Sequence, residues 1–353
     1  MTTPKTVNPL VFFLHRDDRR NRQQITGVYQ DGLATWDLET GRFLEHHFDR
    51  DFDKSEIRNF EDDNPVFFKF VGKNDIEVWD IRTRQQVSLI QKYDPWTYGY
   101  ATSQDRSKIV GLSHCNTDAT KPRLIRVWEA KSGKTQHELT WVDVRDPIRL
   151  YACLTPDGQK LFCGNGRLWT GQAVIRGWDL TTGKECFSAI STETKDYMVE
   201  DGERYPTTHG VCALKTNRDG RLLIAVLYEG VVKIWSTSSG ALLWEYPLFD
   251  RRYLSEGVLI AVSPNDKLLF CQCPKEEYHG QSTCGVIELE TGTVLKRGNM
   301  HYNPVAHIAF SEDSEIIVTS TLRGTTNVNQ WDWQRSPYPK PLLLESPDFH
   351  TRI

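Results

Sequence analysis

Several features that define large classes of proteins are missing from this sequence of 353 residues. Its longest apolar run is far shorter than the ~20 residues that a helix needs to cross a bilayer. Residues 1–10 lack a basic region followed by an apolar stretch, so no signal peptide is expected. The eight cysteines fall well below the density of a disulfide scaffold. These absences predict a cytoplasmic protein with reduced thiols and no membrane partner.

An excess of basic residues is also missing. The chain has 43 lysines and arginines against 47 aspartates and glutamates, which gives a net charge of −4. Proteins that bind nucleic acid need clustered positive charge to displace counterions from the phosphates. Nucleic acid is therefore not expected as a partner.

The common catalytic signatures do not occur either. There is no P-loop, no G-x-S-x-G elbow and no H-E-x-x-H pair. Gly164-Asn165-Gly166 is an isolated glycine turn and does not predict a phosphate cradle. We therefore expect no enzyme activity and no cofactor.

One group of residues has the chemistry of a metal site. Cys271, Cys273, His279 and Cys284 follow a C-x-C-x₅-H-x₄-C pattern, and three thiolates with one imidazole suit tetrahedral zinc. Cysteines on a strand that is buried on both faces instead pack as small apolar residues. The second interpretation is favoured, so no metal is predicted. The sequence alone does not decide whether these four residues bind a metal.

What the sequence does contain is a repeat. Six tryptophans each end a β-like run and precede a turn, and Ile287 takes the same place in a seventh copy. The spacings are 43, 49, 50, 57, 52 and 44 residues, which indicates an array of similar units. The seven anchor positions are Trp36, Trp79, Trp128, Trp178, Trp235, Ile287 and Trp331.

Each unit reads as four short strands. In the clearest copy, strands are expected at residues 148–155, 160–164, 173–180 and 185–191, separated by Pro156-Asp157-Gly158 and Thr181-Thr182-Gly183. The anchor tryptophan ends the third strand, where neighbouring sheets pack face to face. Burial there should stabilise each unit by about 2–3 kcal/mol, so all six tryptophans are expected to be structural.

Four-stranded units at this period predict an all-β, seven-bladed β-propeller. We expect one domain over residues 1–353 with a C-terminal tail at 346–353. The expected blades are residues 9–48, 55–91, 97–142, 148–192, 209–247, 258–299 and 305–345.

With Trp-Asp at the end of the third strand and Thr-Gly or Ser-Gly after it, the chain resembles the WD-repeat β-propeller family. The pair is intact at Trp36-Asp37, Trp79-Asp80, Trp178-Asp179 and Trp331-Asp332. The resemblance covers roughly residues 9–345 and implies a scaffold for protein complexes. Many members carry a Gly-His dipeptide that joins a polar network, and this chain has none.

Ring closure departs from the family pattern too. The family usually lends its first strand to the last blade, whereas here residues 10–15 read as an inner strand of the first blade. This assignment of strands predicts that the first and last blades meet side by side without exchanging a strand. In the alternative assignment, residues 11–15 are the outer strand of the last blade. The polar run at residues 16–24 would then have to form an inner strand.

The insertions in this chain fall on one side. Connections between first and second strands, and between third and fourth strands, are nearly all short, and residues 334–340 are the longer exception. The other connections are long, carry aromatics and arginines, and include residues 192–208. Tyr, Trp and Arg are enriched at interface hot spots. The predicted contact residues are Trp96, Arg167, Trp169, Tyr205, Arg252 and Tyr253.

We therefore predict a non-catalytic scaffold or regulatory subunit that binds one or more proteins or peptides on the insertion-rich side. The acidic run Asp49–Asp63 is read as a solvated or partner-facing patch. Two alternatives remain: an enzyme or small-molecule sensor using the central channel, and a subunit whose seam is completed by a partner strand.

Overall fold

The structure is a computed structural model of the chain, and it describes the strands and many of their turns. The described residues are 11–17, 22–29, 32–48, 57–60, 66–71, 75–80, 83, 85–91, 97–113, 123–141, 150–166, 173–190, 197–200, 203–206, 210–228, 230–248, 258–273, 283–299, 305–321, 328–335 and 340–342.

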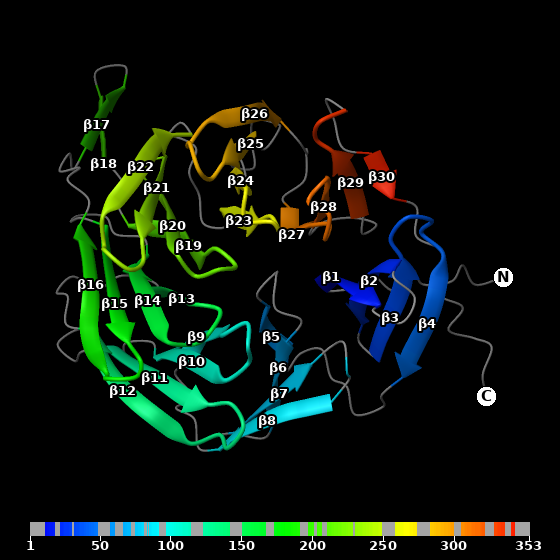
Figure 1. The fold of residues 1–353 in the computed structure, drawn as a ribbon, viewed down its shortest axis with the longest axis horizontal. Coiled ribbons are helices and arrows are strands. Elements are labelled where there is room, and N and C mark those ends of the chain that lie inside the picture. Colours follow the sequence, from blue (N-terminus) through cyan, green and yellow to red (C-terminus); the bar gives the residue numbers. More distant parts are fainter. Residues whose placement is uncertain are drawn as a thin grey trace.

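Seven antiparallel sheets of four strands stand around a central axis, so the predicted seven-bladed β-propeller is confirmed (Figure 1). Each blade uses four consecutive strands. Blade 1 is β1 (Val11–Asp17), β2 (Arg22–Tyr29), β3 (Gly32–Asp37) and β4 (Phe43–Phe48); blade 2 is β5 (Ile57–Phe60), β6 (Val66–Val71), β7 (Asp75–Asp80) and β8 (Gln85–Gln91); blade 3 is β9 (Thr97–Thr102), β10 (Lys108–Ser113), β11 (Arg123–Glu129) and β12 (Thr135–Trp141); blade 4 is β13 (Leu150–Leu154), β14 (Lys160–Asn165), β15 (Val174–Asp179) and β16 (Lys184–Ile190).

The remaining blades repeat this arrangement. Blade 5 is β19 (Val211–Thr216), β20 (Leu222–Leu227), β21 (Val231–Ser236) and β22 (Leu242–Pro247); blade 6 is β23 (Leu259–Val262), β24 (Leu268–Cys273), β25 (Thr283–Glu288) and β26 (Val294–Asn299); blade 7 is β27 (Val305–Phe310), β28 (Ile316–Thr321), β29 (Val328–Asp332) and β30 (Lys340–Leu342). A separate two-stranded sheet is formed by β17 (Tyr197–Glu200) and β18 (Glu203–Pro206).

The ring closes without an exchanged strand in the described part of the chain. β1 is the innermost strand of blade 1 and lies beside β27, the innermost strand of blade 7. The polar run at residues 16–24 falls at the β1–β2 hairpin, because β1 ends at Asp17 and β2 begins at Arg22. Residues 16, 17 and 22–24 of this run therefore lie in strands.

The third strand of each blade ends one residue after the anchor, and the side chain of that last residue holds the turn. In blade 1, the Asp37 carboxylate accepts hydrogen bonds from the Thr40 N–H and hydroxyl at 2.8 and 2.7 Å. Gly41 then has a φ of 70°, in the left-handed region that glycine enters without steric cost. The Trp-Asp-…-Thr-Gly pattern thus encodes a buried aromatic followed by a capped turn.

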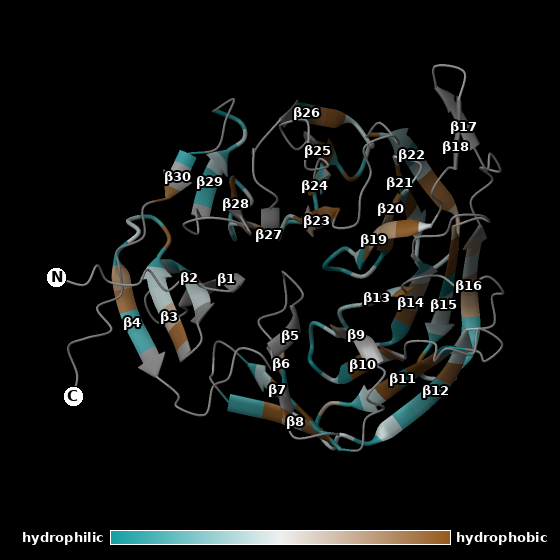
Figure 2. Cartoon of the chain, turned by 180° about the vertical axis from the view of Figure 1, so that it is seen from behind, coloured by the Kyte–Doolittle hydropathy of each residue, from teal (hydrophilic) through white to brown (hydrophobic). Residues whose placement is uncertain are grey.

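Apolar packing between neighbouring blades forms the core. Six buried clusters are found among the described residues, and each joins the facing sides of two blades. They fill the seams between blades 2 and 3, 3 and 4, 4 and 5, 5 and 6, 6 and 7, and 7 and 1. Figure 2 shows hydrophobic residues along the strands and hydrophilic residues at many of the turns.

The anchors contribute to this core by packing against the preceding blade. Trp331 joins Phe270 of blade 6, with ring centroids 6.2 Å apart, and Trp178 joins the cluster shared with blade 3. Five of the six anchor tryptophans are buried, with 1–7% of their surface exposed. Trp79 differs from the expectation, because it is only partly buried.

A substitution at a buried anchor tests this account of stability. Trp331→Ala should lower the free energy of unfolding by about 3–5 kcal/mol, because it leaves a cavity between blades 6 and 7. Urea unfolding followed by circular dichroism would measure the loss. A decrease smaller than about 1 kcal/mol, within the range of ordinary surface substitutions, would contradict it.

Candidate functional site

The structure leaves the predicted contact residues largely undescribed. Trp96, Arg167, Trp169, Arg252 and Tyr253 lie outside the described residues. Tyr205 lies on β18, and only its backbone is described. Their convergence on one surface therefore stays a prediction.

The β17–β18 hairpin occupies the middle of the longest insertion, residues 192–208. Its register places Met198 opposite Tyr205 and Val199 opposite Arg204. The hairpin forms a sheet of its own and lies at the outer edge of the ring, beyond the blades (Figure 1). A two-stranded hairpin is marginally stable by itself in water, so it needs a surface to pack against.

The antiparallel topology separates the connections into two sets. In each blade, the turns after the first and third strands lie at one end, and the other connections lie at the opposite end. We call the first end the turn face and the second the insertion face. The connection with the β17–β18 hairpin and most other long connections leave from the insertion face. The exception is the β29–β30 connection, residues 333–339, which joins its strands on the turn face.

The turn face carries a polar network in blades 3 to 7. The first residue of each turn donates a hydrogen bond from its side chain to the carboxylate or amide oxygen of the third, at 2.5–2.7 Å. The same side chain accepts the N–H that opens the second strand, at 2.8–3.0 Å. The pairs are Ser103–Asp105, Thr155–Asp157, Asn217–Asp219, Ser263–Asn265 and Ser311–Asp313.

The fourth residue of each of these turns has a positive φ. Gly158 and Gly220 serve in blades 4 and 5, but Arg106, Asp266 and Ser314 take the same conformation at 60°, 56° and 65°. A left-handed non-glycine residue costs roughly 1–3 kcal/mol, so its side chain must offer a compensating contact.

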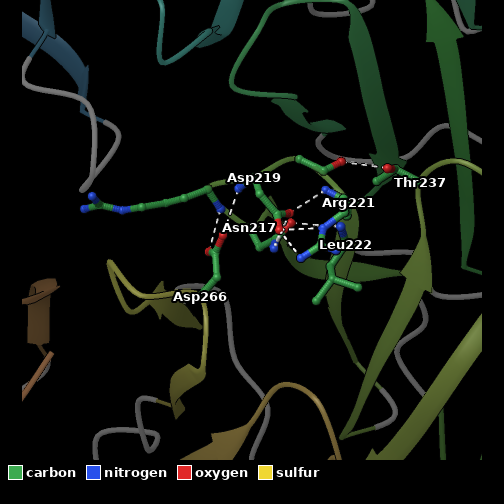
Figure 3. Close-up of polar contacts among 8 residues, drawn as sticks. Asn217, Asp219, Arg221, Leu222, Thr237 and Asp266 are labelled. Carbon is green, nitrogen blue, oxygen red and sulfur yellow. Dashed lines mark hydrogen bonds and ion pairs between the residues drawn. The ribbon is translucent and has the colours of Figure 1, made fainter.

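Each of the three side chains binds the preceding blade. Arg106 forms an ion pair with the buried carboxylate of Asp80 in blade 2. Asp266 accepts the backbone N–H groups of Arg218 and Asp219 in blade 5, both at 2.8 Å (Figure 3). The Ser314 hydroxyl accepts the N–H of Asn265 in blade 6 at 3.4 Å. The turns therefore link neighbouring blades across the turn face.

The pKa values of two aspartates in this network are shifted in opposite directions. Burial is the largest effect on Asp266 and raises its pKa above 3.8, although the two N–H groups oppose the shift. Burial also acts to raise the pKa of Asp219, but hydrogen bonds from Arg221 and Asn217 hold it below 3.8. The carboxylates serve as hydrogen-bond acceptors that hold the blades together.

A signal for this network was present in the sequence. The five turns share the pattern [Ser/Thr/Asn]-x-[Asp/Asn] three residues before the second strand. Sequence reasoning identified these segments as short turns but missed the internal bonds. It could not find the contacts between blades, because they join residues 26 to 49 positions apart.

The structure separates two members of the candidate zinc set. Cys271 lies opposite Gly285 in the register, and Cys284 lies opposite Gln272. Their side chains therefore point to opposite faces of the sheet, and they belong to the clusters shared with blade 5 and blade 7 respectively. Burial raises the pKa of Cys271, which favours the neutral thiol. These two cysteines pack in the core and do not converge on one ion.

Comparisons with known proteins do not assign the chain to a family. No family model matches the chain, and no curated protein sequence matches it. Among the described residues, no helix is long and apolar enough to cross a membrane. Within the same residues, no three His, Cys, Asp or Glu side chains gather as a metal site.

The opposite shifts of Asp219 and Asp266 give a pH test. Because the pKa of Asp219 is lowered by folding, its stabilisation is present above 3.8 and is lost as the pH falls. Because the pKa of Asp266 is raised, its contribution is largest at low pH and is lost as the pH rises through the folded value.

Melting temperatures of Asp219→Asn and Asp266→Asn, compared with the parent protein between about pH 3 and pH 6, would show this. The parent's advantage over Asp219→Asn should grow with pH, and its advantage over Asp266→Asn should shrink. Equal slopes for the two variants would contradict the assignment.

Proposed function

We propose that this protein is a non-catalytic platform that binds one or more proteins or peptides on the insertion face. The contacts would come from Trp96, Arg167, Trp169, Tyr205, Arg252 and Tyr253. The observation that carries the proposal is the β17–β18 hairpin, which stands apart from all seven blades.

The stiffness of the ring supports this role. The described turns of blades 3 to 7 are bonded internally, and several of them bond to the preceding blade, so these turns leave few backbone groups for a ligand. Binding residues occur preferentially on loops that a rigid scaffold positions. In this ring, bonded turns hold the turn face, and long connections extend from the insertion face, where a partner could bind.

We infer further that the chain is a divergent member of the WD-repeat β-propeller family and acts in the cytoplasm. The Trp-Asp residues, with the aspartate accepting bonds from the following turn, support the first inference. The six cysteines whose side chains are described form no disulfide, which agrees with the second. Neither nucleic acid nor a membrane is proposed as a partner.

The contact residues can be tested together. Trp169→Ala combined with Arg252→Ala should abolish capture of the native partner and leave the melting temperature nearly unchanged. Affinity purification from native cells, followed by identification and direct binding of the co-purifying chain, would measure this.

A matched control substitutes residues away from the insertion face. Arg221 lies on the turn face with 84% of its side chain exposed, and Leu243 lies on an outer strand with 52% exposed. Arg221→Ala combined with Leu243→Ala should retain the partner. If both double variants bind alike, the insertion face is not the site. If a small molecule co-purifies instead of a protein, the channel alternative replaces the proposal.

A further inference from the structure

The turn after the third strand of blade 5 differs from the corresponding turns of the six other blades. In those blades, the residue after the anchor is an aspartate or a glutamate. Each carboxylate accepts a hydrogen bond from an N–H or hydroxyl two or three residues later in its own turn, at 2.5–3.2 Å. Blade 5 has Ser236 at this position. The six acidic residues are Asp37, Asp80, Glu129, Asp179, Glu288 and Asp332.

The blade 5 turn still holds donors that could bind an anion. In blade 4, the Asp179 carboxylate accepts the N–H and the hydroxyl of the residue two positions later and the N–H of the next residue, at 2.5–3.0 Å. At the same offsets in blade 5, the Ser238 hydroxyl lies 3.0 Å from the Ser236 hydroxyl, and the Ser239 N–H donates to it at 3.3 Å. The donors therefore surround a neutral acceptor, which binds them less strongly than a carboxylate does.

The folded turn favours a negative charge at this position. In blade 4, the hydrogen bond from the Thr181 hydroxyl, together with the N–H groups of Thr182 and Thr181, lowers the pKa of Asp179 below 3.8. A carboxyl group whose pKa falls in this way is bound more strongly in its charged form than in its neutral form. Because Ser236 is neutral, the blade 5 turn has similar donors without the anion.

A cation from the preceding blade lies beside this turn. The Lys160 ammonium of blade 4, which lies opposite Asp179 in its own sheet, donates a hydrogen bond to the Thr237 carbonyl at 2.8 Å. Thr237 stands between Ser236 and Ser238 in the chain. An anion added to either serine would therefore lie close to a positive charge across the seam between blades 4 and 5.

The serine hydroxyls of the turn are accessible. Ser236 is partly exposed, and Ser238 and Ser239 are exposed. Thr237 differs from them, because it is buried and its hydroxyl donates to the Gly220 carbonyl at 2.6 Å (Figure 3). The bonds to the neutral Ser236 hydroxyl also break more easily than the bonds to a carboxylate. The Ser236 hydroxyl is therefore open to a modifying enzyme.

We propose that Ser236 is a phosphorylation site, and that its phosphate takes the place of the carboxylate found in the six other blades. A protein kinase transfers the γ-phosphoryl group of ATP to this residue. The Ser236 oxygen forms a bond to the γ-phosphorus, the bond from that phosphorus to the departing oxygen of ADP breaks, and the serine proton passes to a base of the kinase.

The phosphate then accepts the Ser238 and Ser239 donors and pairs with the Lys160 ammonium. The turn joins β21 to β22, and β22 already contacts blade 6, where the Trp244 indole donates to the Leu289 carbonyl at 3.0 Å. Phosphorylation would thus connect blades 4, 5 and 6 through one hairpin. The site lies on the turn face and does not depend on the function proposed above.

Mass spectrometry of the protein from native cells tests the proposal directly. The full-length chain is isolated with phosphatase inhibitors and cleaved with trypsin, which releases residues 234–251 between Lys233 and Tyr253 as one peptide ending at Arg251. Fragment ions that separate Ser236 from the three hydroxyl residues after it should place a phosphate on Ser236. A peptide without phosphate, or with phosphate only at its other residues, would overturn the proposal and leave Ser236 as a neutral cap.

A second measurement tests the role of the phosphate in the turn. Phosphoserine is incorporated at position 236 during bacterial synthesis, and half of the sample is treated with a phosphatase to give the matched unmodified chain. The phosphorylated chain should melt about 1–4 °C higher, because its phosphate gains charge-assisted hydrogen bonds. Its Ser238 and Ser239 amides should also exchange more slowly. An equal or lower melting temperature would contradict the assigned role.

Three substitutions complete the design. Ser236→Asp restores the carboxylate of the other blades and should raise the melting temperature, whereas Ser238→Asp is the matched control, which adds the same charge two residues away and should raise it less. Lys160→Gln removes the cation across the seam, so it should reduce the gain that phosphorylation gives. Equal stabilisation by the two aspartates, or an unchanged gain in Lys160→Gln, would sink the proposal.

Discussion

Face-to-face packing of apolar side chains between neighbouring blades is the constraint on which the rest of this structure depends. Each anchor buries its side chain against the preceding sheet, so a blade is stable only beside its neighbours. The chain lacks the Gly-His residues that join polar networks in similar propellers, and no exchanged strand locks the described ring. Apolar contacts, together with links between turns, hold the blades in place.

The turn face shows how strain and bonding offset one another. Arg106, Asp266 and Ser314 adopt a backbone conformation that favours glycine, and each reaches the preceding blade from it. The strain lies in turns that bond to the neighbouring blade, whereas most long connections leave from the opposite face. The division of the molecule into a fixed face and a variable face follows from the antiparallel topology.

The anchor of blade 2 differs from the other five anchor tryptophans. Trp79 is only partly buried, and Thr26 of blade 1 takes a position that is apolar in the six other blades. Sequence reasoning assigned all six anchor tryptophans the same structural role. It missed the exception because Trp79-Asp80 matches the repeat as well as the buried copies do, and because its exposure depends on residues of another blade.

The sequence by itself determined the number of blades, their strand order and the type of turn after each anchor. These features depend on local periodicity and on side chains that bond to their own turns, as Asp37 does to Thr40. Only the tertiary structure decided which turns bind one another, that Cys271 and Cys284 face opposite ways, and which anchor remains exposed. Those outcomes depend on register and on contacts between blades, and residues about 50 positions apart in the chain carry no local signal of their meeting.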